Sequence, residues 1–103
     1  MRTLVFRVIG QQIEKDPGCD FTGLVAGTSD YLQARFLFSG DWNGCKKAAS
    51  FWCLGGEHAA PIINGVCTIP PEALTRREFS VSVTGARKDY RIRTGKVKVQ
   101  QEV

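Results

Sequence analysis

The sequence lacks the features that most membrane and secreted proteins carry. No apolar run approaches the roughly 20 residues needed to span a bilayer. The N-terminal apolar run is short and is interrupted by Arg7, so it does not form a signal-peptide core. We therefore expect no membrane association, and a protein that is kept in a cytosol at least until an assembly or lysis step.

Catalytic motifs are equally absent. The sequence has no Gly-x-Ser-x-Gly elbow, no phosphate-cradling glycine loop and no His-Glu-x-x-His motif. Its one histidine, His58, is expected in a turn beside Gly55 and Gly56. A catalytic base also needs a nucleophile and an orienting partner. We expect no enzymatic activity, no catalytic residue and no cofactor.

Four cysteines are present, but their spacing does not indicate a metal site or a disulfide framework. No pair among Cys19, Cys45, Cys53 and Cys67 has the short gap of a structural zinc knuckle. Without a secretion signal, disulfides are disfavoured. The favoured interpretation is buried free thiols that pack as small apolar side chains, and no metal is expected. Convergence of Cys45, Cys53 and Cys67 with His58 on a metal ion is the weaker alternative.

What the chain does contain is a series of short, alternating segments between turn residues. Such a pattern, with no long helical period, is typical of strands in a sandwich. The expected strands are 3–9, 12–15, 31–38, 46–53, 59–63, 66–69, 79–85, 89–93 and 96–99. At most one short helical turn is expected, near 71–75, because Pro71 and Glu72 suit a first helical turn.

The sequence therefore predicts one domain, residues 1–103, with an all-β fold: an antiparallel β-sandwich of immunoglobulin-like type. Asn43-Gly44 and Asn64-Gly65 are both pairs that favour a type I′ turn. The residues expected to form the core and its turns are Phe36, Trp42, Gly44, Phe51, Leu74 and Val81.

Trp52 stands apart from those core residues. It follows Phe51, and on a regular strand one of two neighbours must point away from the core. Trp52 is thus the better candidate for an exposed contact, unless a loop or a partner subunit covers it.

The basic excess is concentrated at the C-terminal end. From residue 76 onward there are eight basic and three acidic residues, a net charge of +5, whereas residues 1–75 carry a net charge of −1. Arg91 and Arg93 share one face of their strand, as do Lys96 and Lys98. If the two strands pair as a hairpin, one side is cationic and the other apolar.

Two interpretations of this basic hairpin stay open. It could meet an acidic partner or nucleic-acid phosphates. It could also be a solvated outer face that discourages edge-to-edge aggregation, which is the favoured interpretation. No aromatic residue alternates with the basic ones, as a platform for single-stranded nucleic acid requires, so nucleic acid is not an expected partner.

Three segments carry a family resemblance: FLFSGDWNGCKKAASF from Phe36, INGVCTIPPEAL from Ile63 and FSVSVTG from Phe79. Over residues 30–100 the chain resembles the N-terminal β-sandwich domain of upper baseplate proteins from phages of Gram-positive bacteria. In that family an aromatic-rich strand runs into a W-x-G turn, and a C-x-IP-x-E-x-L segment leads into a strand ending in Val-x-Gly. Family members continue into a helical segment and receptor-binding parts, which residues 1–103 do not contain.

The resemblance implies a structural component of a phage virion, in a baseplate or tail, located in the virion or in the bacterial host cytoplasm during production. The implied partners are other virion proteins or a second copy of the chain. One alternative is a phage-encoded inhibitor that binds a host defence protein or nucleoprotein through the basic hairpin. Another is a carbohydrate-binding module that uses its tryptophans. The expected partner-binding residues are Trp52, Arg91, Arg93, Lys96 and Lys98.

Overall fold

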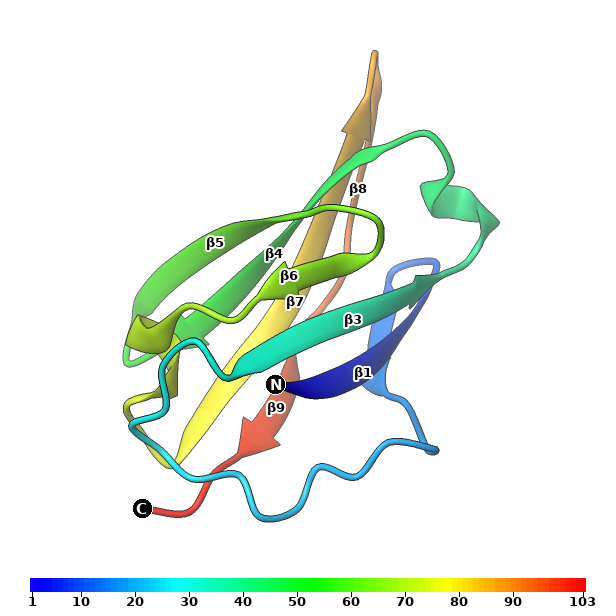
Figure 1. Ribbon diagram of the computed structural model, residues 1–103. Coiled ribbons are helices and arrows are strands. Elements are labelled where there is room, and N and C mark those ends of the chain that lie inside the picture. The colour runs from blue at the N-terminus through cyan, green and yellow to red at the C-terminus, as the bar shows by residue number, and fades with distance from the viewer.

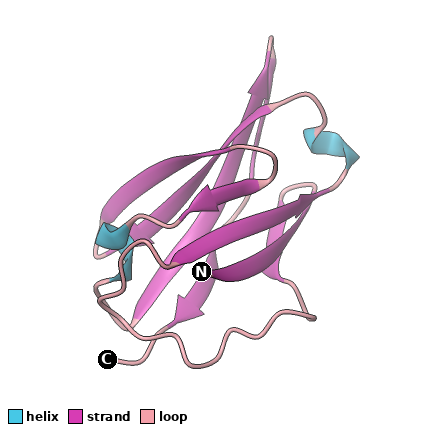
Figure 2. Cartoon of the chain, viewed as in Figure 1, coloured by secondary structure: helices cyan, strands magenta, loops and turns pink.

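The computed structural model describes all 103 residues and is all-β, with two sheets and two short 3-10 turns (Figures 1 and 2). The strands are β1 (Arg2–Ile9), β2 (Gln12–Lys15), β3 (Leu32–Phe38), β4 (Lys46–Cys53), β5 (Gly56–Ile62), β6 (Val66–Thr68), β7 (Glu78–Arg87), β8 (Tyr90–Arg93) and β9 (Val97–Gln100). The turns are η1 (Gly40–Trp42) and η2 (Pro71–Leu74), which lie at opposite ends of the molecule in Figure 2. No helix is long or apolar enough to cross a membrane.

The first sheet has the strand order β2-β1-β3-β6, and one of its pairs contradicts the expectation of an antiparallel fold. β1 and β3 run parallel, in register from Arg2 opposite Leu32 to Val8 opposite Phe38. A parallel pair requires a long crossover, and residues 16–31 supply it by running along one side of the molecule (Figure 1). Side-chain alternation specifies a face but not a strand direction, so the sequence pattern could not show this.

The second sheet has the order β5-β4-β7, with β8 and β9 both on the remaining edge of β7. The expected hairpin between β8 and β9 is wrong, because these strands pair with β7 and not with each other. Thr94 explains the difference: its backbone N–H donates to the Val83 carbonyl oxygen, and its hydroxyl accepts from the Val83 N–H. The chain therefore continues in one direction along β7, and residues 90–100 form a single interrupted edge strand.

The two sheets pack face to face in a sandwich-like arrangement around one cluster of 21 buried apolar residues. Phe6 and Phe36, on neighbouring strands, stack with ring centroids 5.5 Å apart. The Phe38 ring lies 5.2 Å from that of Trp42. The inner positions of β7 and β9 are likewise apolar, since Phe79 pairs with Val99. Alternation along each strand thus places one face in the core and the other outside.

Three turns refine the expected pattern. Asn64 and Gly65 both have positive φ, 53° and 79°, as a type I′ turn requires. Asn43-Gly44 does not form the expected type I′ turn. Asn43 has φ −61° and ψ 134° and Gly44 has φ 76°, which are the values of a type II turn. Asn43 also ends the turn η1, which was not expected. The turn after β4 contains two residues, Leu54 and Gly55, so β5 begins earlier than expected.

Candidate functional site

The outer side of the second sheet gathers all five expected partner-binding residues. Residues paired across neighbouring strands point to the same side of a sheet. Ser80 of β7 is paired with Trp52 on one edge and Lys98 on the other. Arg93 is opposite Thr84, and Arg91 is opposite Ala86, which also faces Lys46. We call this surface the basic face, defined by Lys46, Trp52, Arg91, Arg93, Lys96 and Lys98.

Trp52 is half-buried and fixed from two directions. Its indole Nε1 donates to the Ser82 hydroxyl at 2.9 Å. The Lys96 ammonium lies 3.8 Å from the ring centroid, a cation–π contact. An aromatic ring therefore does lie among the basic side chains, although no aromatic residue alternates with them on β8 or β9. It comes from β4, across the width of β7, and only strand register brings it there.

Small side chains occupy the middle of the basic face. Ser50 and Ser82 are 8% and 7% exposed. The Ser50 hydroxyl donates to the Glu57 carboxylate of β5 at 2.5 Å. This acid therefore already has a hydrogen-bond donor within the sheet. The centre of the basic face is therefore formed by short side chains, with long cationic side chains along one edge. This shape suits contact with a broad macromolecular surface.

The cations of this region have no acidic partners. The two ion pairs of the structure join Arg7 to Glu14 at 2.6 Å and to Asp16 at 3.9 Å, both on the first sheet. None of the eight basic residues from Arg76 onward has a carboxylate within 4.0 Å. Their charges remain available to an external partner.

Arg87 is the exception among these cations, because it has a structural role. Its Nη1 donates to the Asn43 carbonyl oxygen at 2.7 Å, and its guanidinium lies 4.5 Å from the Tyr90 ring centroid. The Tyr90 hydroxyl donates to the Asp41 carbonyl oxygen at 2.8 Å. Together these contacts hold the β7–β8 hairpin against η1.

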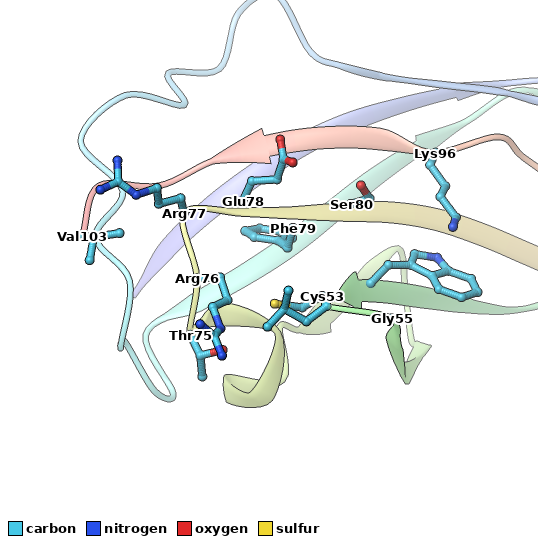
Figure 3. Close-up of a pocket in the computed structure, with 12 residues that line it drawn as sticks. Cys53, Gly55, Thr75, Arg76, Arg77, Glu78, Phe79, Ser80, Lys96 and Val103 are labelled. Carbon is cyan, nitrogen blue, oxygen red and sulfur yellow. The ribbon is translucent and has the colours of Figure 1, made fainter.

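A pocket of about 610 Å³ lies at the Trp52 end of the basic face (Figure 3). One wall comes from the end of β4 and its turn, Trp52 to Gly55; the other comes from the segment before β7 and from Lys96. Figure 3 shows Glu78 and Ser80 extending to the same side of β7, with Lys96 reaching from the loop before β9 toward the indole of Trp52. The Glu78 carboxylate accepts a hydrogen bond from Gln100 at 2.8 Å.

Sequence reasoning did not single out three residues of this pocket: Leu54, Arg76 and Arg77. The two arginines were visible as part of the C-terminal basic excess, but they precede the strand and have no alternation to assign them a face. Leu54 carried no signal, because a leucine in a two-residue turn is not an expected pattern.

The expected core residues lie in the interior. Phe51, Leu74 and Val81 have no exposed surface, and Phe36 is 3% exposed. Trp42 is also fully buried and donates its Nε1 hydrogen to the Gly10 carbonyl oxygen at 2.9 Å, so its ring is inaccessible to a ligand. The remaining residue of this set, the exposed Gly44, adopts φ 76° where the chain leaves η1.

The histidine and the cysteines are spread over the fold. His58 lies in β5, opposite Phe51, and not in a turn as expected. No three His, Cys, Asp or Glu side chains are close enough to hold a metal ion. All four cysteines are free thiols, with Cys45 and Cys67 buried. Burial raises the pKa of the Cys67 thiol to about 12, so it stays protonated at neutral pH.

Comparisons with known proteins do not assign this chain to a family. No protein-family model matches the chain. A search of curated proteins likewise gives no match. Functional inference therefore depends on the residues and their arrangement.

Proposed function

We propose that this protein is an interaction domain of a phage particle, a baseplate or tail component that docks to another virion protein or to a second copy of itself. The observation that carries the proposal is the basic face, on which the cations lack carboxylate partners and the Lys96 ammonium lies over the half-buried ring of Trp52. A sheet surface on which cations outnumber acids favours steering and orientation of a macromolecular partner.

The resemblance to upper baseplate domains supports the phage setting of this proposal. The residues that carry it include Trp42 and Leu74, both of which are fully buried. The resemblance therefore supports a shared kind of fold, whereas the basic face supports the docking mode. The immunoglobulin-like assignment also remains a proposal: two facing sheets support it, and the parallel β1–β3 pair departs from the antiparallel pattern.

The two alternatives receive unequal support from the surface. Carbohydrate stacking has little, because Trp42 is buried and the ammonium of Lys96 covers the ring of Trp52. Binding to a host defence protein would use the same basic face and would differ from virion docking in the partner alone.

The test is retention of the protein in purified phage particles. Particles of the encoding phage are banded by density and probed for the wild-type chain, for Arg93→Glu with Lys98→Glu, and for Arg35→Glu with Lys88→Glu. The second pair is a control: it makes the same charge change at two exposed positions outside the set that defines the basic face, one on β3 and one in the β7–β8 turn. The first pair should reduce retention by about tenfold or more, since each charge reversal costs both attraction and orientation.

Two outcomes would contradict the proposal. Absence of the wild-type chain from the particles would remove the virion function. Equal retention of the two double variants would remove the basic face as the docking surface.

A further inference from the structure

The β4–β5 turn has an unfavourable residue at its tip. Leu54 and Gly55 have φ values of 46° and 74°, so both occupy the left-handed region. Glycine and asparagine tolerate that region, whereas a bulky side chain is strained there. The other turn with two positive φ values, Asn64-Gly65, has the favoured pair.

Packing does not account for Leu54. Its side chain is 75% exposed, so it stabilises the core little. An exposed apolar residue held in a strained conformation suggests a role in binding another molecule rather than in folding. Leu54 is one of the residues that line the Trp52 pocket.

The pocket lining combines apolar and cationic side chains. Trp52, Cys53 and Leu54 contribute apolar surface from the end of β4 and its turn. Arg76, Arg77 and Lys96 contribute cations, none of which has a carboxylate within 4.0 Å, and the Lys96 ammonium lies over the Trp52 ring. The volume, about 610 Å³, is in the range of sites that enclose part of a ligand.

We propose that this pocket binds an acidic, extended segment of a partner protein in which apolar and acidic side chains alternate. Successive side chains of an extended segment point to opposite sides, so apolar residues would contact Leu54 and Cys53 while carboxylates meet the cations. Those cations are Arg76, Arg77 and the Lys96 ammonium that lies over the Trp52 ring. The inference rests on the proposed docking function and names the partner chemistry at one end of the basic face.

Two features favour a peptide over single-stranded nucleic acid. The ammonium of Lys96 lies 3.8 Å from the centre of the Trp52 ring, where a stacked base would have to displace it. Leu54 offers an aliphatic contact that suits a side chain better than a base.

The experiment is a titration of ¹⁵N-labelled protein with the capped peptide Glu-Leu-Glu-Leu-Glu-Leu, followed by amide and indole chemical shifts. Saturable shifts are expected at the Trp52 indole, Leu54, Gly55, Ser80 and Lys96. Peptides with Lys in place of Glu, or Ser in place of Leu, should bind about tenfold more weakly, because each loses either the ionic or the apolar contacts.

Protein variants separate the pocket from the fold. Arg76→Glu with Arg77→Glu should weaken peptide binding by about tenfold, whereas the exposed control Arg35→Glu should leave it unchanged. Leu54→Asn should raise the melting temperature and still weaken binding by about fivefold, since it relieves strain and removes the apolar contact. Stability and affinity moving in opposite directions would support a binding role for Leu54.

Three results would overturn the inference: no shifts at millimolar peptide, shifts confined to another surface, or tighter binding of an octathymidine probe than of the peptide. Failure of the proposed virion function can be distinguished from failure of this inference. If the chain is absent from phage particles, the virion function is wrong whatever the titration gives. If the chain is retained but the titration is silent, only the acidic-segment inference is wrong.

Discussion

The indole ring of Trp42 lies directly over the backbone of Gly85. A β-carbon at position 85 would be 2.8 Å from Cε3 and Cζ3 of the indole, closer than van der Waals contact allows. On its other side Trp42 donates to the carbonyl oxygen of Gly10, in the β1–β2 turn. One side chain therefore links the first sheet to the second, and the absence of a side chain at Gly85 makes room for it.

Gly85→Ala is expected to destabilise the fold by roughly 1–3 kcal/mol, because the new methyl group must displace the indole or bend β7. Urea denaturation followed by tryptophan fluorescence measures the change. Gly95→Ala is the matched control, since nothing lies within 4 Å of a β-carbon at that position. Equal effects of the two substitutions would contradict the proposed role of the Trp42–Gly85 contact.

The two type I′ turns permit a reciprocal exchange. Leu54→Asn should stabilise the protein by roughly 0.5–1 kcal/mol, because asparagine tolerates positive φ. Asn64→Leu should destabilise it by a similar amount, since Asn64 has φ 53°. Thermal denaturation of both variants is the measurement, and a destabilising Leu54→Asn would show that Leu54 is not strained.

The Cys67 thiol predicts an alkaline loss of stability. Burial raises its pKa from 9.0 to about 12, so the folded chain retains a proton that the unfolded chain releases. Stability is therefore complete below pH 9 and falls as the pH rises toward 12. The contribution lost between pH 9 and pH 11 is about 2 kcal/mol, because the loss approaches 1.36 kcal/mol per pH unit only once the unfolded thiol is fully ionised.

Urea denaturation at several alkaline pH values, under reducing conditions, measures this loss. Cys67→Ala lacks the thiol and should show a flatter dependence over the same range, even though the substitution lowers stability at every pH. Identical pH slopes for the two proteins would contradict the assignment.

The two tryptophans should differ in accessibility. Trp42 is fully buried, and Trp52 is half-buried beneath Lys96, so acrylamide should quench Trp52 alone. Lys96→Gln should increase that quenching, because the amide forms no cation–π contact with the ring. Lys88→Gln, at the exposed β7–β8 turn, serves as the control. Unchanged quenching in Lys96→Gln would indicate that the ammonium does not cover the ring.

Local sequence signals identified most strands and the separation of inner from outer faces. β4 matches its expected bounds, 46–53. The turn at Pro71–Leu74 was also apparent, since proline at the start of a helical turn is a local preference. These features depend on residues that are neighbours in the chain.

Strand order and strand direction could not be predicted from local sequence signals. The parallel pairing of β1 and β3, and the alignment of β8 and β9 along one edge of β7, join segments that are distant in sequence. Such pairings are selected by the combined packing of the core, and alternation alone is compatible with several of them.

The sequence by itself determined an all-β chain, an apolar set for the core and a cationic C-terminal segment, because composition and alternation are local properties. Only the tertiary structure decided that Trp52 joins Lys96 on one face and that Leu54 and Arg76 line one pocket. Those proximities follow from the register of β4 against β7 and from the continuation of the chain past Thr94. The register and the continuation are both set by hydrogen bonds between strands. No single segment of the sequence specifies those hydrogen bonds.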